Sequence, residues 1–358
     1  MKKAADYIAV SAFFVIVIMF AAYTLVMGRH GSESEKADSS DIRHNVQTYV
    51  SSNFPLSSNW KSLRTTMFVM TGKKNFDNIY ILKNRLVEIT DFDKDRLDKN
   101  ISQINEFSEN TDTPVYVMLA PTAAGIYSAK LPAYTSNTDQ REMIDNIYYD
   151  IDTFFPMYSA RNNYVYYRTD RKWTSFGAYF AYADGIKELG FEPVVLSNYD
   201  QEYTSNSYYG GLYSELCYNS IGADRVNIFR SKYKTTVDSV ELYREDQVLT
   251  SKSVYFRSAL KTADKTAIFL QGDNFTKATV KTTAEDAPKL LIIKGSYANT
   301  LVPFLTPHYS EITLVDPDKL KEEGKTLSDV ADTSAYDQIL FMYDCDQFAD
   351  ETNFDLLK

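Results

Sequence analysis

Asp170 and Lys172 stand two positions apart in the sequence, just before Trp173 and the start of a predicted helix. A carboxylate and an amine in this arrangement can orient and activate a nucleophile, provided that the amine has lost its proton. Lysine has an ordinary pKa of about 10.4, so it acts as a base only where burial or a like charge, such as that of Arg171, lowers that pKa. Asp170 favours the ammonium form instead, which makes a structural or ligand-holding Lys172 the alternative.

A serine, Ser296, follows the apolar run Lys289–Lys294 (KLLIIK) after a single glycine, Gly295. It therefore stands where a predicted strand ends and a predicted helix begins, which is where reactive groups lie in open α/β sheets. Free N–H groups at the start of that helix would stabilise an oxyanion. A serine that only caps the helix explains the same spacing.

The distribution of cysteine and histidine argues against a metal site. Two cysteines, Cys217 and Cys345, lie outside any zinc-type spacing, and three histidines, His30, His44 and His308, are widely scattered. The sequence therefore predicts no metal and no cofactor. Whether the two cysteines form a disulfide stays open.

Length, composition and charge limit the functions that this protein can have. The chain has 358 residues, of which 44% are hydrophobic, enough for the core of one large domain or two smaller ones. Its formal charge of -10 comes without the clustered lysine and arginine that nucleic acids require, so no nucleic-acid partner is expected. The 28 tyrosines suit a glycan-binding surface and equally a tyrosine-rich core.

A membrane anchor is predicted near the N-terminus. The segment Tyr7–Met27 is an uninterrupted apolar run of 21 residues, and a helix with a rise of about 1.5 Å per residue crosses a hydrocarbon core of about 30 Å at this length. Lys2 and Lys3 precede the run, so the positive-inside rule predicts a cytoplasmic N-terminus and an extracytoplasmic main domain at the cell membrane. A cleaved signal peptide is the alternative, although it would have a shorter apolar segment and a small-residue cleavage site.

This anchor divides the chain into three parts. Residues 1–28 form the anchor, residues 29–41 form a polar flexible linker, and residues 42–358 form the extracytoplasmic domain. Within the domain, residues 218–285 change to short strand-like runs between polar turns, which predicts a β-rich insertion.

The apolar patterns of the domain predict alternating helices and strands. A hairpin is expected at Asn78–Leu82 and Arg85–Ile89, then a helix that begins near Asp93 and a buried strand at Val115–Leu119. Further helices are predicted at Met143–Tyr149, at Phe176–Leu189 with Thr174 or Ser175 as N-cap, at Tyr297–Leu305 and at Lys325–Ala331. Further strands are predicted at Tyr164–Tyr167, Val226–Phe229, Ser253–Phe256, Ala267–Leu270, Ala278–Val280, Lys289–Lys294, Glu311–Val315 and Gln338–Tyr343. Together they predict an open α/β fold with a mostly parallel sheet.

Two long stretches carry a resemblance to a known family. The sequence TDRKWTSFGAYFAY, from Thr169, followed by LLIIKGSYANTLVPFLTPHYSEITLVD, from Leu290, resembles the DHHW family, relatives of the alginate O-acetylation proteins and of the SGNH hydrolases. Weaker support comes from PTAAGIYSAKLP at residues 121–132 and YYGGLYSEL at residues 208–216. The resemblance implies an SGNH-hydrolase-like (flavodoxin-like) sheet behind the predicted transmembrane helix.

The same resemblance implies a catalytic triad, and this chain departs from it. In the family, the first residue of an Asp-His-His-Trp signature, its second histidine and the serine of a later Asp-Ser-Tyr or Asp-Ser-Phe block act together. Asp170 and Ser296 match two of these residues, whereas Arg171 and Lys172 replace both histidines and Gly295 replaces the aspartate before the serine.

Five residues are candidates for oxyanion or ligand binding. Gly272 and Asn274, in the stretch FLQGDNF, would be the oxyanion donors that SGNH enzymes take from a glycine and an asparagine, although Gly-Asp-Asn is also an ordinary turn sequence. Trp173 is either a core residue or a platform on which a sugar ring stacks. Tyr297 and Arg171 complete the set because they neighbour the signature residues.

The resemblance implies a membrane-anchored extracytoplasmic protein in the O-acetylation of a cell-surface polysaccharide. Its partner would be a multi-pass membrane O-acyltransferase, and with a degenerate signature its own role would be to bind glycan or partner. An active acetyl esterase or acetyltransferase that uses Ser296, Lys172 and Asp170 is one alternative, and a non-enzymatic envelope protein that binds another protein is a second. We expect Asp170 and Ser296 to face one cleft at the carboxyl edge of the sheet.

Overall fold

The computed structural model describes residues 15, 57–133, 135–147, 150–245 and 247–357. The chain divides into two compact units, one formed by residues 74–213 and 220–358 and the other by residues 1–73 and 214–219. The predicted linker, and the predicted anchor apart from Val15, lie outside the described residues. Within the described part of the chain, no helix has both the length and the apolar character that a bilayer span requires.

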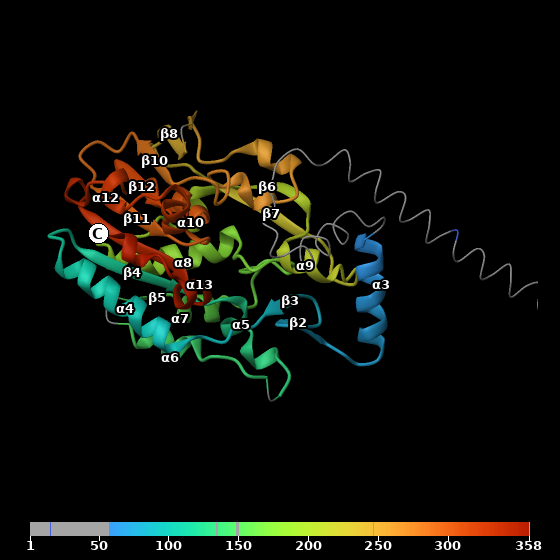
Figure 1. Ribbon diagram of the computed structural model, residues 1–358. Coiled ribbons are helices and arrows are strands. Elements are labelled where there is room, and N and C mark those ends of the chain that lie inside the picture. The colour runs from blue at the N-terminus through green and yellow to red at the C-terminus, as the bar shows by residue number, and fades with distance from the viewer. Residues whose placement is uncertain (1–14, 16–56, 134, 148–149, 246, 358) are drawn as a thin grey trace, which may run out of the picture. The chain divides into compact units, whose positions relative to one another are not determined.

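The larger unit is built on an eight-stranded sheet (Figure 1). Its strand order is β5 (Asp150–Asp152), β4 (Val115–Ala120), β13 (Gln338–Asp344), β11 (Lys289–Lys294), β12 (Glu311–Val315), β10 (Lys277–Thr282), β8 (Val237–Arg244) and β9 (Gln247–Ser251). The first five strands in this order pair in parallel, and the last three join the sheet by antiparallel pairing. The fold is therefore α/β with a mixed, mostly parallel sheet, as the sequence predicts.

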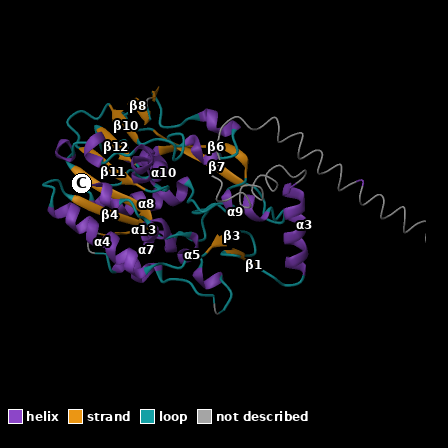
Figure 2. Cartoon of the chain, in the orientation of Figure 1, coloured by secondary structure: helices purple, strands orange, loops and turns teal. Residues whose placement is uncertain are grey.

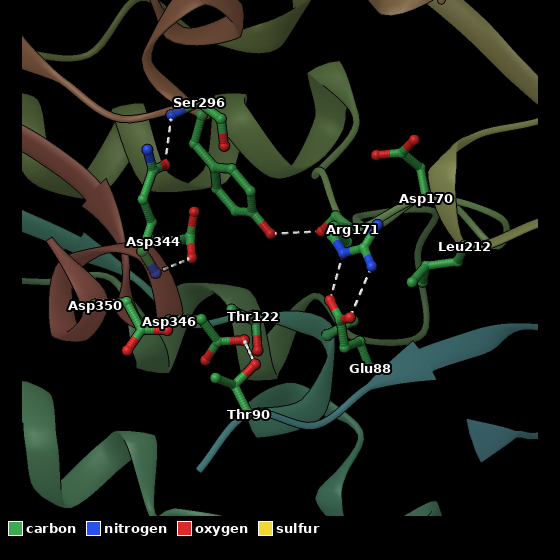
Figure 3. Close-up of a pocket in the computed structure, with 13 residues that line it drawn as sticks. Glu88, Thr90, Thr122, Asp170, Arg171, Leu212, Ser296, Asp344, Asp346 and Asp350 are labelled. Atoms are coloured by element: carbon green, nitrogen blue, oxygen red, sulfur yellow. Dashed lines mark hydrogen bonds and ion pairs between the residues drawn. The ribbon is translucent and has the colours of Figure 1, made fainter. Parts of the chain in front are cut away.

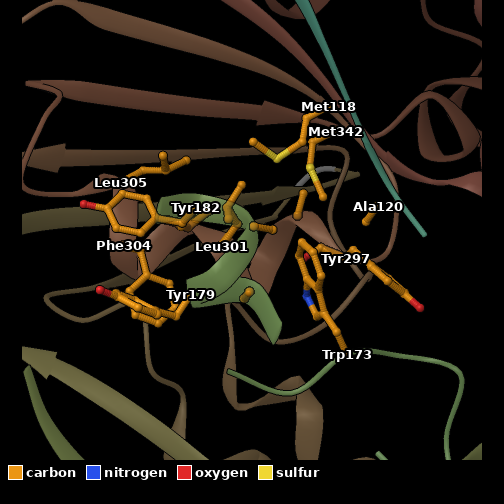
Figure 4. Close-up of a cluster of buried hydrophobic side chains, with 14 of the residues drawn as sticks. Met118, Ala120, Trp173, Tyr179, Tyr182, Tyr297, Leu301, Phe304, Leu305 and Met342 are labelled. Carbon is orange, nitrogen blue, oxygen red and sulfur yellow. The ribbon is translucent and has the colours of Figure 1, made fainter. Parts of the chain in front are cut away.

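One face of this sheet is covered by α8 (Ser175–Glu188) and α10 (Ala298–Leu305), which also contact each other. Figure 4 shows the aromatic side chains of this buried cluster, among them Trp173, Tyr182 and Phe304. Because aromatic side chains bury large apolar areas, this cluster holds the segment before α8 close to the start of α10.

The opposite face is covered by α4 (Lys94–Glu109) and α13 (Cys345–Asp350), so that helices lie on both sides of the sheet (Figure 2). Alternate residues of β11 point to this side, and the residues between them point toward α8 and α10. A strand that is buried on both faces needs apolar side chains at every position, which explains the apolar centre of KLLIIK.

The described chain also contains smaller sheets and further helices. Two further sheets consist of β1 (Asn75–Phe76), β2 (Ile79–Ile81) and β3 (Leu86–Glu88), and of β6 (Tyr199–Tyr208) and β7 (Asp224–Ser231). The remaining helices are α3 (Ser57–Met70), α5 (Ala123–Ile126), α6 (Gln140–Asp145), α7 (Phe154–Ser159), α9 (Gly211–Leu216), α11 (Pro317–Glu323) and α12 (Leu327–Val330).

Several predicted elements are confirmed near their predicted bounds. The hairpin is β2 and β3, the helix that follows Asp93 is α4, and the helix before Gly190 is α8, whose N-cap Thr174 accepts a hydrogen bond from the Gly177 amide. The three long apolar runs of the C-terminal part are β11, β12 and β13, and they pair in parallel as predicted. Long apolar runs and strong caps leave little ambiguity about the element that they form.

Three predicted strands are wrong. The run Tyr164–Tyr167 contributes only one isolated bridge, from Tyr166 to Trp173. The runs Ser253–Phe256 and Ala267–Leu270 also meet through a single bridge, and the second of them overlaps a 3-10 helix. The apolar residues of these runs are mostly buried. A short apolar run can be buried without pairing with another strand, so its sequence does not distinguish the two cases.

Two further predictions change in detail. Residues 218–285 are rich in strands, but β8, β9 and β10 extend the central sheet, whereas β7 pairs with β6. The helix predicted at Met143–Tyr149 corresponds to α6, which ends at Asp145.

Candidate functional site

A pocket of about 400 Å³ lies where three parallel strands of the central sheet end (Figure 3). Thr122, Ser296 and Asp344 line it at the carboxyl ends of β4, β11 and β13. Asp170 lines it too, so the structure brings Asp170 and Ser296 to one pocket although they are far apart in the sequence. The other charged residues in its lining are Glu88, Arg171, Asp346 and Asp350.

Asp170 is buried, and its carboxylate is held by hydrogen bonds. Oδ2 accepts from the Tyr208 hydroxyl at 2.6 Å and from the Gly211 amide at 2.9 Å, and Oδ1 accepts from the Lys172 amide at 2.9 Å. A Cβ atom on Gly210 would lie 2.1 Å from Oδ2, so this position admits only glycine. The stretch YYGGLY therefore holds the carboxylate of Asp170 in position.

Lys172 lacks the environment of a base. Its Nζ donates to Oδ2 of Asp273 at 3.0 Å. Burial lowers the pKa of Lys172, but the negative charges of Asp273, Asp264 and Asp170 and the hydrogen bond to Asp273 together outweigh burial, and the net pKa is raised. The amine therefore stays protonated, and Lys172 is not among the residues that line the pocket of Ser296.

The ion pair of Lys172 is part of a buried network. Asp273 also accepts from Nζ of Lys294 at 2.9 Å and from Nδ2 of Asn299 at 3.0 Å, and Lys294 donates to Asp316 at 2.9 Å. The side chain of Lys294 is only 1% exposed. Burial lowers its pKa, but Asp273 and Asp316 outweigh this and raise it. This network was not predicted from the sequence, where its signal is a lysine at the end of a strand that is buried on both faces.

Arg171 binds a carboxylate of the protein at the edge of the pocket. Its Nη2 donates to Oε1 of Glu88 at 2.7 Å and its Nε donates to the other carboxylate oxygen, which gives a bidentate pair. The Arg171 side chain is 45% exposed. A guanidinium that is half solvated and paired in this way adds no free positive charge to the pocket.

Trp173 belongs to the core, and Tyr297 packs against it while also lining the pocket. Trp173 is 1% exposed, its Nε1 donates to the backbone oxygen of Tyr297 at 3.2 Å, and the two ring centroids are 4.8 Å apart (Figure 4). The Tyr297 hydroxyl donates to the backbone oxygen of Arg171 at 2.6 Å. Of the two interpretations of Trp173, the structure therefore supports the core residue, because a buried ring cannot stack on a sugar.

Gly272 and Asn274 do not join Ser296. Gly272 has a φ of 72°, and its backbone oxygen accepts from Asn299 Nδ2 at 3.0 Å. Asn274 is exposed and lines a different pocket, which it shares with Thr276 and Lys319. Gly272 lies in a bend, Asn274 lies in the loop that follows it, and neither residue lines the Ser296 pocket as an oxyanion donor would.

Gln347 is a residue of the site that the sequence analysis missed. Its Oε1 accepts from the backbone amide of Ser296 at 2.8 Å (Figure 3). A Cβ atom on Gly295 would lie 2.7 Å from this Oε1 and 2.9 Å from Cδ1 of Tyr343. Gln347 thus fills the space of a side chain at position 295 and occupies a backbone donor that could otherwise stabilise an oxyanion.

The floor of the pocket is acidic. Burial raises the pKa of Asp344 to about 6. Burial, and then the negative charge of Asp344, raise the pKa of Asp346 well above its ordinary value. Asp346 accepts from Nε2 of Gln140 at 2.9 Å and from the Thr90 hydroxyl at 3.2 Å. The raised pKa values reduce the negative charge that Asp344 and Asp346 carry, but the lining contains five carboxyl groups and one guanidinium, so the pocket remains acidic.

No imidazole lines this pocket among the residues that the structure describes. His308 lies beyond α10, where its Nε2 is 2.7 Å from the Tyr182 hydroxyl, and burial lowers its pKa to about 4. His30 and His44 lie outside the described residues. The described residues also contain no cluster of His, Cys, Asp and Glu suited to a metal ion, and Cys217 and Cys345 are both free thiols.

Gly295→Ala is expected to lower the free energy of unfolding by about 1–3 kcal/mol, because the new methyl group would collide with Gln347 and Tyr343. Gly222→Ala is the matched control, since no atom lies within 4 Å of a Cβ built there, and it should change stability by less than about 0.5 kcal/mol. Urea denaturation measures both. Gly295→Ala/Gln347→Ala should regain part of the lost stability. If a double-mutant cycle showed no coupling between the two substitutions, the predicted collision between residues 295 and 347 would be wrong.

Comparison with known proteins agrees with this fold. A family model described as DHHW protein matches residues 59–315. The crystal structure of a DHHW family protein from Eubacterium siraeum is 22% identical, with a TM-score of 0.62 over 78% of this chain and 93% of that one. PatB1 of Bacillus cereus, solved with a sulfonyl adduct, is 16% identical, with a TM-score of 0.64 over 80% of this chain and 99% of that one.

A third structure, the O-acetyltransferase domain of Pseudomonas putida AlgJ, is 12% identical, with a TM-score of 0.47 over 78% of this chain and 95% of that one. No curated protein sequence matches. The family model covers well over half of the residues, from the end of the N-terminal region to the last residue of β12. This chain therefore belongs to the DHHW family.

Proposed function

We propose that this protein binds a saccharide chain in the pocket beside Ser296 and serves the O-acetylation of a cell-surface polysaccharide, without itself transferring or cleaving the acyl group. The state of Lys172 carries this proposal. In the family signature a histidine stands at this position, whereas here an ammonium group is held by Asp273 at 3.0 Å. Without a base, the Ser296 hydroxyl keeps its proton and remains a poor nucleophile.

The oxyanion side of the site supports the same conclusion. The Ser296 amide donates to Gln347, so it is not aimed at a substrate oxygen. Gly272 and Asn274 line no part of this pocket. The alternative of an active esterase or acetyltransferase built on Ser296, Lys172 and Asp170 thus lacks both a base and a complete set of oxyanion donors.

The pocket suits a saccharide that is neutral or positively charged. Sugar hydroxyls are hydrogen-bond donors, and carboxylates such as Asp344 and Asp350 are acceptors that bind them well. A polyuronate would bring further negative charge to a pocket whose one guanidinium, that of Arg171, is already paired with Glu88. We therefore infer a neutral or amino-sugar polymer as the ligand.

The proposed cellular setting is supported by the apolar N-terminal run and by the resemblance to the family. The apolar run Tyr7–Met27 would anchor the protein in the cell membrane with its domain outside the cytoplasm. There it would present the polysaccharide to a multi-pass membrane O-acyltransferase, which would supply the acyl-transfer chemistry.

Asp344→Asn is expected to weaken binding of a glucosamine oligosaccharide about tenfold, since it removes a carboxylate from the pocket while keeping its shape. Isothermal titration of the full-length chain with glucosamine, N-acetylglucosamine and uronate oligomers of equal length measures this. Asp184→Asn is the control, because Asp184 lies on α8 in an exposed pair with Lys187.

Tightest binding of the uronate oligomer, or no binding of any of the three, would refute the proposed ligand class.

In the cell, the same two variants test whether saccharide binding contributes to O-acetylation. Asp344→Asn should lower the O-acetyl content of the surface polysaccharide, and Asp184→Asn should leave it unchanged. Equal acetylation in both strains would count against the proposed function.

A further inference from the structure

Helix α3 carries an exposed apolar stripe. Trp60, Leu63, Met67 and Met70 recur every three or four residues, so they share one side of the helix. Their exposed fractions are 51%, 50%, 61% and 83%. Single exposed apolar residues are common on protein surfaces, but four in one helical row form a continuous patch.

The opposite side of α3 is polar and attached to its own unit. Ser62 and Thr65 are buried there. Thr65 Oγ1 donates to the backbone oxygen of Leu216 at 2.8 Å, and Nδ2 of Asn219 donates to the Ser62 hydroxyl at 2.9 Å. An ordinary surface helix packs its apolar side inward. In α3 the polar side faces inward instead, and contacts among the described residues of its unit do not account for the exposed stripe.

The charge around the stripe differs from that of the whole chain. Residues 57–74 contain Lys61, Arg64, Lys73 and Lys74 and no acidic residue, which is a charge of +4 in a chain of net charge -10. A helix that combines an aromatic and apolar stripe with basic residues is typical of the interface of an anionic bilayer. An acidic protein partner would match the charge, but it would not require so large an apolar row.

We propose that α3 docks on the surface of an anionic lipid bilayer, with the stripe of Trp60, Leu63, Met67 and Met70 buried among the headgroups. Twenty-nine residues, 28–56, separate the apolar run Tyr7–Met27 from Ser57. A random coil of 29 residues would have a root-mean-square span of about 30 Å, so a segment of this length is long enough to keep α3 of an anchored protein within reach of the membrane. This docking goes beyond the proposed function, because it requires neither Ser296 nor the pocket.

Fluorescence quenching by brominated lipids tests the proposal on the full-length chain. The protein contains two tryptophans, Trp60 and Trp173, and Trp173 is buried at 1% exposure, so quenching reports on Trp60. The chain is reconstituted in vesicles of brominated phosphatidylcholine with or without phosphatidylglycerol. We expect quenching in the anionic vesicles that is lost in Trp60→Phe and at least halved in Leu63→Ser/Met67→Ser.

Two controls keep this result specific. Val195→Ser/Val248→Ser removes apolar surface that is similarly exposed in the larger unit. The tryptophan fluorescence of this variant, and of Ser296→Ala, should be quenched as strongly as that of the wild type. Lys61→Glu/Arg64→Glu should reduce quenching in the anionic vesicles, and added salt should do the same. Circular dichroism confirms that each variant is folded.

Absence of Trp60 quenching in the anionic vesicles would overturn the proposal. Cross-linking of Trp60→Cys to a second copy of α3, with no quenching, would show an interface between copies and would also overturn it. Equal quenching in the wild type and in Leu63→Ser/Met67→Ser would assign the signal to the N-terminal run alone. The proposed saccharide binding would survive each of these outcomes, since it depends on a different set of residues.

Discussion

Asp273→Ala is expected to lower the free energy of unfolding by about 3–5 kcal/mol, because it leaves a buried ammonium group with half of its partners. Lys294 is 1% exposed and is bound by Asp273 and Asp316, each at 2.9 Å. Asp273 also accepts from Lys172 and Asn299, so the substitution removes three hydrogen bonds, and the buried ammonium of Lys294 bears most of the cost.

Urea denaturation of the full-length chain measures this loss, with Asp184→Ala as the control. Asp184 pairs with Lys187 at 3.5 Å on the exposed surface of α8, and loss of such a pair should change stability by less than about 1 kcal/mol. If Asp273→Ala were as stable as Asp184→Ala, the buried network would not stabilise the fold in the way that its burial implies.

The stability difference between the wild type and Asp273→Ala is expected to decrease at acidic pH. Burial raises the pKa of Asp273, but the charges of Lys294 and Lys172 outweigh burial, and the net pKa is lowered. Its stabilisation is therefore present above the unfolded pKa, about 3.9, and is lost as the pH falls through the folded pKa. The stability difference between the wild type and Asp273→Ala should be constant near neutral pH and should shrink below about pH 4.

Lys172→His alone is expected to produce no Ser296-dependent ester hydrolysis. A catalytic triad acts as a unit, and loss of one member typically costs a factor of about 10⁶, so one restored member restores little. The new imidazole would also face Asp273, the present partner of Lys172, and not the pocket of Ser296. Hydrolysis of a chromogenic acetyl ester, with Ser296→Ala as the baseline, measures the effect.

Restoring the residues of the family signature is not expected to restore ester hydrolysis by itself. Gly295→Asp would place a side chain where Gln347 Oε1 now lies, 2.7 Å from the Cβ position. We therefore expect Arg171→His/Lys172→His/Gly295→Asp to stay near the baseline, and any gain to need Gln347→Ala, which frees the Ser296 amide. Robust Ser296-dependent activity in the wild type or in Lys172→His would show that the site is not degenerate.

Much of the fold could be predicted from local patterns. The runs that became β11, β12 and β13 are apolar throughout their centres because helices cover both faces of the sheet, and Asp93 and Thr174 mark helix starts through their side-chain caps. The run Tyr164–Tyr167 is equally apolar but forms no strand. Its burial comes from contacts between segments far apart in the sequence, which a local pattern does not contain.

The sequence by itself determined that the signature is altered: Arg171 and Lys172 stand at the two histidine positions and Gly295 stands before Ser296. Only the tertiary structure decided what these changes mean. The protonation of Lys172 depends on Asp273, and the availability of the Ser296 amide depends on Gln347, and both partners are distant in the chain. Electrostatic interactions and steric contacts act over a few ångströms of space, whatever the separation in sequence, so the chemical state of this site is set by the fold.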